Sequence, residues 1–258
     1  MSATLLRVQE LYKSFGGVTA VHNVSFEARL GQVVAIIGPN GAGKTTLFNL
    51  ISGVFGPDGG KIWLDEHRLD KLCSHQAAAL GIARTFQNVQ LFDNMTVLEN
   101  VKMGRYRHER TNLLAAAMGL THRQEQQTYT AALQRLKRVD LVGKAHRLAS
   151  SLPLGEQRLL ELARALASEP RLLLLDEPTA GLNAMETVKL AATISRIRAN
   201  NITVLLVEHD MNLVMSVADW VIVLNYGEKL AQGRPEEVQN DPRVIEAYLG
   251  QENGSGQI

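Results

Sequence analysis

The sequence predicts an α/β protein built around a parallel β-sheet, and three stretches of the chain support this fold class. Residues 38–45 read Gly-Pro-Asn-Gly-Ala-Gly-Lys-Thr, a phosphate-loop pattern lying between an apolar run and a helical pattern. A second apolar run, residues 172–175, is bounded by prolines and ends in two carboxylates, which is typical of a buried parallel strand. Between the two, residues 96–150 show few strand signals, which indicates a helical insert.

Length and charge limit the classes of function. The 258 residues can bury one substantial core, alone or with a smaller subdomain. Lys and Arg total 27 against 26 for Asp and Glu, so the net charge of +1 gives no sign of a nucleic-acid partner. The single Cys73 cannot form an intrachain disulfide, and we expect it to be a small apolar filler. Residues 1–10 have no long apolar core of the kind that a signal peptide needs, so we expect a cytosolic location. No stretch approaches the roughly 20 apolar residues that cross a bilayer, so we expect any membrane role to come from another subunit.

The first 30 residues predict two short strands, at 5–8 and 24–28, with an aromatic residue and two glycines between them. Phe15 precedes Gly16 and Gly17, whose flexibility allows the ring to lie against a flat base such as adenine. Core packing is the alternative explanation for an aromatic side chain at this position.

The phosphate-loop motif follows a predicted strand at 33–37 and opens a helix at Lys44. Its glycines let consecutive backbone N–H groups surround an anion, and the helix N-terminus adds partial positive charge. Lys44 is expected to bridge the β- and γ-phosphates and Thr45 to ligate Mg²⁺, while Thr46 caps or packs. An ordinary glycine-rich turn is the alternative. The predicted nucleotide-binding residues here are Gly38, Pro39, Asn40, Gly41, Ala42, Gly43, Lys44, Thr45 and Thr46.

The stretch between the motif and the second apolar run alternates in pattern. A turn at 57–60 leads to a strand at 61–64, a helix starts at Ser74, and residues 81–86 are extended with Gln87 at their end. In the helical insert, residues 105–127 are polar and interrupted by Gly104 and Gly119, which predicts a mobile connection. Another helix opens at 151–158 and continues to about residue 168.

The carboxylates after residues 172–175 lie where open α/β sheets bind ligands. Asp176 is expected to hold the Mg²⁺ shell, which leaves Glu177 to polarise an attacking water molecule. An acidic turn after a core strand is the alternative.

The last third of the chain alternates again between helix and strand. Residues 180–183 form a loop into a helix at 187–198, and the strand at 202–207 ends beside His209, which could contact a γ-phosphate or its attacking water. Two strands at 220–224 and 229–231 flank a turn, a helix covers 243–249 and ends at Gly250, and the tail 251–258 is expected to be disordered.

Taken in order, these motifs resemble the nucleotide-binding subunit of an ATP-binding cassette transporter over nearly the whole chain. A P-loop kinase or GTPase would leave the later motifs unexplained. The resemblance implies a single ABC ATPase domain over 1–250: a RecA-like core with an antiparallel β subdomain (1–87 and 169–250) and a helical subdomain (88–168). It implies an adenine-stacking Phe15, Walker A at 38–45, Gln87 as the link between Mg²⁺ and the membrane partner, Walker B at Asp176, Glu177 as general base, a dimer-contacting loop of Ala180, Gly181, Leu182 and Asn183, and His209 as the switch histidine.

A closer resemblance is to the ATP-binding subunit of branched-chain amino-acid importers. It is carried by residues 84–87, 91–92, 95–97, 180–183, 207–211 and the ending 244–250, Val-Ile-Glu-Ala-Tyr-Leu-Gly. The resemblance implies import of leucine, isoleucine and valine. Lipid or lipopolysaccharide exporters and urea or amide importers share several of these segments, so they remain alternatives, as does an ABC ATPase outside transport.

The signature motif departs from the usual Leu-Ser-Gly-Gly-Gln. Here it reads Leu152, Pro153, Leu154, Gly155 and Glu156, without the hydroxyl and one backbone N–H that would meet the partner's nucleotide. We therefore expect a composite site with a weaker hold on ATP, and a second, non-identical ATPase with the fuller motif, a homodimer being the alternative. The other implied partners are two membrane-spanning permease subunits docked near residues 87–92 and, indirectly, a periplasmic or extracellular substrate-binding protein. The implied location is peripheral, at the cytoplasmic face of the inner membrane.

Overall fold

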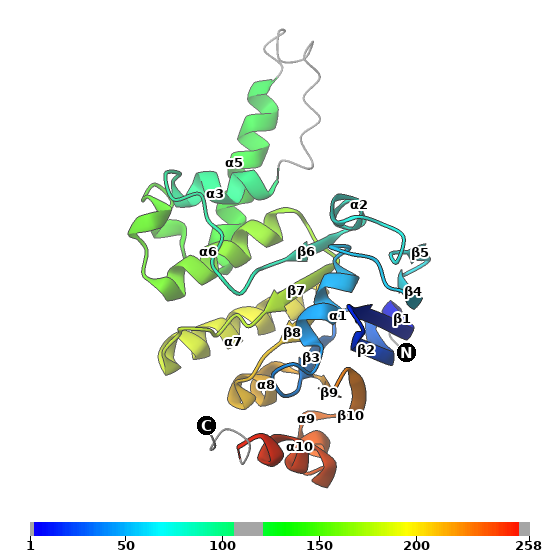
Figure 1. The fold of residues 1–258 in the computed structure, drawn as a ribbon. Helices are drawn as coiled ribbons and strands as arrows, with labels where there is room; N and C mark the ends of the chain where they lie inside the picture. The colour runs from blue at the N-terminus through cyan, green and yellow to red at the C-terminus, as the bar shows by residue number, and fades with distance from the viewer. Residues whose placement is uncertain (1–2, 106–120, 253–258) are drawn as a thin grey trace.

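The computed structural model describes residues 3–105 and 121–252, and the strands in these ranges form two sheets (Figure 1). The smaller sheet is antiparallel, with strand order β2-β1-β4-β5. Its strands are β1 (Thr4–Phe15), β2 (Val18–Arg29), β4 (Gly59–Leu64) and β5 (His67–Arg68).

The larger sheet has the order β10-β9-β3-β8-β7-β6, and all neighbours in it are parallel except β10, which runs antiparallel to β9. Every residue of β3, β7 and β8 is buried, as expected for parallel strands covered on both faces. Their carboxyl ends therefore meet at one edge of the sheet. The strands are β3 (Val33–Ile37), β6 (Ile82–Arg84), β7 (Leu172–Asp176), β8 (Thr203–Val207), β9 (Trp220–Asn225) and β10 (Glu228–Gly233).

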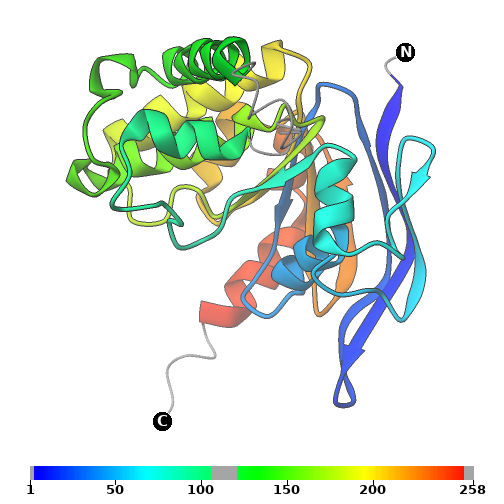
Figure 2. The same ribbon diagram turned by 90° about the horizontal axis from the view of Figure 1, so that it is seen from above.

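Helices cover the larger sheet and form a separate layer beyond it. Figure 2 shows this helical layer, made of α3, α5 and α6, and the β1–β2 hairpin on opposite sides of the molecule. No helix in the described ranges is long and apolar enough to cross a membrane. The α-helices in the described ranges are α1 (Lys44–Ile51), α2 (Ser74–Ala79), α3 (Val97–Gly104), α5 (Thr121–Arg138), α6 (Leu154–Ala167), α7 (Ala184–Ala199), α8 (Met211–Val217), α9 (Pro235–Gln239) and α10 (Pro242–Glu252).

Helix α6 joins the helical layer to the sheet because it contributes to two hydrophobic cores. Leu160 and Ala163 pack with the residues of α3 and α5, whereas Leu162 and Leu166 pack with β7, β8 and α7. These positions follow the helical period, so one helix presents two apolar faces. A third core joins α1, one face of the larger sheet and the antiparallel sheet.

Several boundaries differ from those predicted from the sequence. The first two strands extend to Phe15 and from Val18, so the predicted connection is a tight hairpin at Gly16 and Gly17. Helix α7 starts at Ala184 because Asn183 caps it: its Oδ1 accepts a hydrogen bond from the Glu186 N–H at 3.0 Å. Short helices α8 and α9 were not predicted.

The end of the chain and Cys73 also differ from expectation. Helix α10 continues through Gly250 to Glu252, so the prediction of a disordered tail over 251–258 is wrong for its first two residues, and residues 253–258 lie outside the described ranges. Cys73 is exposed and is not an apolar filler. Most of the predicted mobile connection, residues 106–120, also lies outside the described ranges.

Candidate active site

The phosphate loop runs from the end of β3 to the start of α1 and packs against backbone on both sides. Gly38 has φ 148°, and a Cβ there would lie 2.1 Å from the carbonyl oxygen of Leu224. Gly43 has φ 97°, and its Cβ would lie 2.3 Å from the carbonyl oxygen of Ala20. Both positions therefore require glycine for space as well as for conformation.

Lys44 lies inside this loop with only 6% of its surface exposed. Its Nζ donates hydrogen bonds to the carbonyl oxygens of Gly38 at 2.6 Å and Pro39 at 2.8 Å. Burial lowers the pKa of Lys44, and the nearby carboxylates of Glu177 and Asp176 partly offset that effect. The ammonium group is therefore held where the loop would surround an anion.

The next two positions begin helix α1. The Thr45 side chain is exposed and that of Thr46 is half-buried. The predicted Mg²⁺ contact of the Thr45 hydroxyl therefore needs no repacking of the core.

Asp176 is the last residue of β7, with its side chain 8% exposed. Its Oδ2 accepts a hydrogen bond from Arg84 Nη2 at 2.7 Å. The sequence placed Arg84 in an extended segment, and the pairing of Arg84 with Asp176 was not predicted. The buried carboxylate is thus tied to strand β6 as well as to its own strand.

Glu177 and two other predicted site residues lie together at the carboxyl edge of the sheet. Gln87 Nε2 donates to Glu177 Oε2 at 2.8 Å, and His209 Nε2 lies 2.7 Å from Glu177 Oε1. Glu177 has φ 46°, a left-handed conformation that is uncommon for a residue with a side chain and occurs preferentially at functional sites. The structure therefore brings together three residues that are 90 and 32 positions apart in the chain.

Glu208, which the sequence analysis did not single out, holds this group in place. It is 2% exposed, and its Oε2 accepts a hydrogen bond from the His209 N–H at 2.9 Å. Its Oε1 accepts hydrogen bonds from the Thr179 N–H and hydroxyl at 2.9 and 2.6 Å. The end of β8 is thereby tied to the loop that follows β7. The sequence signal that could have found Glu208 is its position as a charged residue directly after a buried strand.

Arg158 of α6 holds the segment that carries Gln87. Its guanidinium donates to the carbonyl oxygens of Phe86 at 3.0 Å and Gln87 at 2.5 Å. Because α6 is part of the helical layer, these hydrogen bonds tie that layer to the segment that carries Gln87.

Phe15 lies at the end of β1 with 46% of its surface exposed. Its ring makes an edge-to-face contact with Phe55, at 5.3 Å between centroids, and Lys13 Nζ lies 5.2 Å from its centroid. The ring is partly open to solvent, which is compatible with stacking, but its adenine contact stays a prediction.

The altered signature motif and the predicted dimer-contacting loop lie against each other. Pro153 is the N-cap residue of α6, and Leu154 Cδ2 is 2.8 Å from where a Cβ on Gly181 would lie. A Cβ on Gly155 would lie 2.5 Å from Oε1 of Glu186, in the first turn of α7. The Glu156 carboxylate pairs with Lys144 at 2.5 Å and so has a partner within the chain.

A hollow of about 500 Å³, here called the groove, lies between the larger sheet and the helical layer, beside Gln87. Its lining includes four partly exposed apolar side chains, Val54, Phe86, Phe92 and Met103, together with Arg84 and Arg164. Exposed apolar side chains gathered in one hollow are typical of a protein contact surface.

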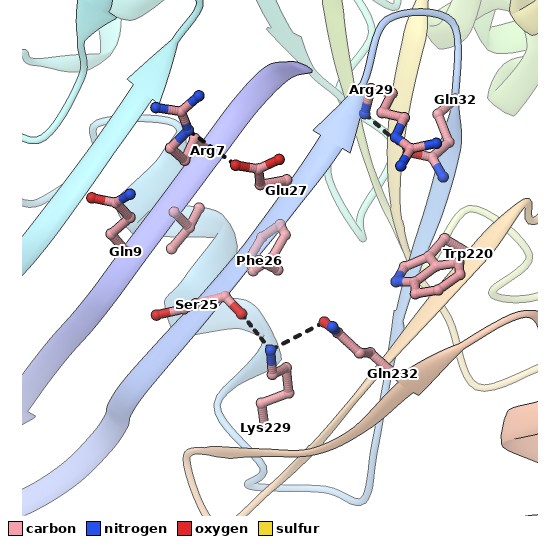
Figure 3. Close-up of a pocket in the computed structure, with 11 residues that line it drawn as sticks. Arg7, Gln9, Ser25, Phe26, Glu27, Arg29, Gln32, Trp220, Lys229 and Gln232 are labelled. Carbon is pink, nitrogen blue, oxygen red and sulfur yellow. Dashed lines mark hydrogen bonds and ion pairs between the residues drawn. The ribbon is translucent and has the colours of Figure 1, made fainter. Parts of the chain in front are cut away.

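A second hollow, of about 430 Å³, lies between the β1–β2 hairpin and strands β9 and β10; we call it the rear pocket (Figure 3). In it Lys229 Nζ donates to the carbonyl oxygen of Ser25 at 2.6 Å and to Gln232 Oε1 at 3.1 Å. Trp220, the first residue of β9, lines it, and so does Lys229 of β10, which pairs with Leu224 near the other end of β9. Neither Asp176 nor Glu177 lines the rear pocket.

Residues 21–180 match the ABC transporter family, and residues 228–253 match a family described as branched-chain amino acid ATP-binding cassette transporter. The chain is 46% identical to the high-affinity branched-chain amino acid transport ATP-binding protein BraF of Pseudomonas aeruginosa and to its counterpart LivG of Salmonella typhimurium, over 97% of this chain and 100% of each relative. Among solved structures, the ADP conformation of MJ1267, an ATP-binding cassette of an ABC transporter, aligns with a TM-score of 0.86 at 31% identity, over 96% of this chain and 100% of that one.

Proposed function

The chain belongs to the ATP-binding proteins of ABC transporters, in the branched-chain amino-acid group, and on that premise we propose that it hydrolyses ATP to power import of leucine, isoleucine and valine. The observation that carries the proposal is the contact of Glu177 with Gln87 and His209 at the same sheet edge as the phosphate loop. The separate packing of the helical layer supports the division into a core (1–87 and 169–250) and a helical subdomain (88–168).

In this proposal the loop at 38–45 binds the phosphates through its backbone N–H groups. Lys44 exchanges the carbonyl oxygens of Gly38 and Pro39 for phosphate oxygens, which carry full charge and form stronger hydrogen bonds. Phe15 stacks on the adenine ring at the hairpin end.

Glu177 is the proposed general base for hydrolysis. Its carboxylate accepts a proton from water as the water oxygen attacks the γ-phosphorus and the bond to the β-phosphate oxygen breaks, giving ADP and phosphate. His209, 2.7 Å from Glu177 Oε1, orients that carboxylate. Gln87 moves with the helical layer and so makes the orientation of Glu177 depend on the position of that layer.

Mg²⁺ fits this site as a companion of the nucleotide. The described residues contain no cluster of three or more His, Cys, Asp or Glu side chains that could hold a metal alone. The hydroxyl of Thr45, the carboxylate of Asp176 and the amide oxygen of Gln87 are the oxygen donors that would hold the ion, which keeps several waters and binds phosphate oxygens. Bound there, Mg²⁺ would neutralise charge that develops on the phosphates.

Two ATPase subunits would close on two nucleotides, each presenting its signature helix to the other. The contact of Gly181 with Leu154 supports treating the dimer-contacting loop and the signature start as one surface. Because Pro153 and Leu154 offer neither a hydroxyl nor glycine flexibility, we propose a second, non-identical ATPase with the fuller motif.

Restoring the common motif tests this pairing. The double variant Pro153→Ser with Leu154→Gly should leave ATP turnover of the assembled transporter equal or higher, because the partner nucleotide gains contacts. A sharp loss of ATPase activity would refute the proposed weaker site.

Of the two proposed membrane-spanning permease subunits, one would insert a cytoplasmic segment into the groove of this chain and the other into the groove of the second ATPase, with the chain at the cytoplasmic face of the inner membrane. Phe86, Phe92 and Met103 supply the apolar contacts, and Gln87 follows Phe86 directly in the chain. A substrate-binding protein outside the membrane would reach the ATPase only through the permeases.

Uptake of labelled leucine in the source cells tests the proposed function. The cells carry either the wild-type chain or Glu177→Gln at equal protein level, and uptake of an unrelated amino acid is the control. Loss of leucine uptake alone is the expected result. Unchanged leucine uptake would contradict the substrate assignment, and urea, amides and envelope lipids would be the substrates to test next.

A further inference from the structure

We propose that Arg84 is a positioning residue: it orients the Asp176 carboxylate, and it makes that orientation depend on what fills the groove. This inference rests on the proposed ATPase function, because it assigns a role to the side chain that touches the Walker B carboxylate. The structure has Arg84 at the end of β6, where one guanidinium faces both the ATP site and the groove.

The guanidinium of Arg84 joins two elements of the ATP site. Nη2 donates to Asp176 Oδ2 at 2.7 Å, and Nη1 donates to Asn49 Oδ1 at 2.6 Å and to Ser52 Oγ at 3.0 Å. Asn49 belongs to α1 and Ser52 is its C-cap residue, so Arg84 connects the phosphate-loop helix to the end of β7. The side chains of Arg84 and Asp176 are 11% and 8% exposed, which makes their pairing strong and directional.

The same guanidinium lies close to two aromatic rings. Its Cζ is 5.8 Å from the centroid of Phe48, which is fully buried, and 5.3 Å from that of Phe86, which is 46% exposed and lines the groove. Arg84 Nε is buried without a hydrogen-bond partner, so Nη1, Nη2 and the two rings set the position of the group. A partner that moves Phe86 therefore moves a cation that contacts Asp176.

Without the hydrogen bond from Arg84 Nη2, the Asp176 carboxylate would lose the partner that fixes its orientation at the end of β7. A carboxylate free to rotate would face the proposed metal shell for only part of the time, so the contribution of Mg²⁺ to ATP binding would fall.

The groove supplies a matched pair of residues as a control. Arg164 lies over the ring of Phe92 at 5.8 Å, and Phe92 is 45% exposed, nearly the same as Phe86. Arg164 interacts with the carboxylate of Glu161 on its own helix, and Glu161 Oε1 accepts a hydrogen bond from the Phe86 N–H at 3.4 Å. Within the described ranges Arg164 makes no contact with Asp176, so Arg164→Lys, which keeps the charge beside Glu161, and Phe92→Leu alter the same groove without removing a side chain that contacts Asp176.

The test measures the ATP dissociation constant in a Glu177→Gln background, once with Mg²⁺ and once with EDTA. The dissociation constant in EDTA divided by the one in Mg²⁺ gives the contribution of Mg²⁺ to ATP binding. Arg84→Lys, which keeps the charge but loses the fork, should lower this ratio about tenfold or more, the size expected when a residue supporting a metal ligand is changed. Phe86→Leu should lower it by a smaller factor. Arg164→Lys and Phe92→Leu should leave it unchanged.

The thermal midpoint of each variant is recorded in parallel. If Arg84 served only the fold, Arg84→Lys would lower the thermal midpoint and both affinities while the ratio stayed constant, and that result would overturn the proposal. Should Arg84→Lys fail to fold, an equal ratio for Phe86→Leu and Phe92→Leu would overturn it. Absence of any ATP binding by the Glu177→Gln chain would instead overturn the proposed function.

Discussion

Polar and charged residues lie at both ends of the parallel strands, but the residues at the two ends differ in what they contact. At the amino ends, Asp219 Oδ2 accepts a hydrogen bond from the first N–H of β3, at Val33, at 2.9 Å, while its Oδ1 pairs with Arg198 at 2.5 Å. Thr203 bridges Gly31 N–H and the carbonyl oxygen of Arg29 at 2.9 and 3.2 Å. Each of these polar groups satisfies a neighbouring chain segment.

At the carboxyl ends, side chains from different elements contact one another or the phosphate loop. Lys44 donates to two carbonyl oxygens of its own loop, and Glu177, which has a left-handed backbone conformation, contacts Gln87 and His209. Such contacts can be exchanged for a charged ligand, whereas those at the amino ends would leave backbone groups unpaired if broken. The difference supports the proposal that the carboxyl edge of the sheet binds and hydrolyses ATP, whereas the contacts at the amino edge stabilise the fold.

The largest predicted effect is at the carboxyl edge. Glu177→Gln should lower ATP turnover by a factor of about 10² or more, because it removes the general base, while ATP binding is retained. Steady-state phosphate release and equilibrium ATP binding by the purified chain check both parts. Turnover within a few-fold of the wild type would show that another group accepts the proton.

Two lysines sharpen the comparison, because burial lowers the pKa of both and both donate to backbone carbonyl oxygens. Lys44→Ala should raise the ATP dissociation constant about 10- to 100-fold, which is the loss of affinity expected when a hydrogen bond to a charged group is removed. Lys229→Ala, in the rear pocket, should leave the ATP dissociation constant unchanged, because the rear pocket contains no residue of the phosphate loop. Equal weakening by both variants would contradict the assignment of phosphate binding to Lys44.

The groove extends the comparison to the membrane partner. Met103→Glu should lower leucine uptake about tenfold or more, because it buries an unpaired charge against the permease. ATP turnover of the isolated chain should not change. Val142→Glu is the control, since Val142 is 43% exposed against 40% for Met103 and is not part of the groove. Equal uptake by the two variants would place the permease contact elsewhere.

The smallest effect on turnover is predicted at the amino edge. Asp219→Ala should cost about 1–3 kcal/mol of unfolding free energy, because the Val33 N–H loses its partner, with turnover per folded molecule unchanged. Urea unfolding and ATPase activity measured on the same preparation separate the two quantities. A drop in turnover without loss of stability would mean that the amino edge also serves the chemistry.

The sequence alone predicted the parts of the site that depend on local pattern. The buried strands 33–37 and 172–176 and the positions of Lys44, Glu177 and His209 follow from apolar runs and from what stands at their ends. Parallel strands share an edge, so residues from different motifs were expected to meet there.

The supporting residues could not be predicted, because their partners are far away in the chain. Arg84 is 92 positions from Asp176, and Arg158 is 71 positions from Gln87. Which side chains meet depends on strand order and on the packing of α6, and the local hydrophobic pattern predicts neither. The lengths of β1 and β2 were underestimated for a similar reason, since strand length depends on pairing along the whole edge.

The most direct test is a crossed comparison of Glu177→Gln and Asp219→Ala, in which ATP turnover per folded molecule is measured for both at one temperature. The account predicts that Glu177→Gln lowers ATP turnover by a factor of about 10² or more, whereas Asp219→Ala keeps wild-type turnover in the molecules that remain folded. Equal losses of turnover in the two variants would contradict the division of work between the two edges of the sheet.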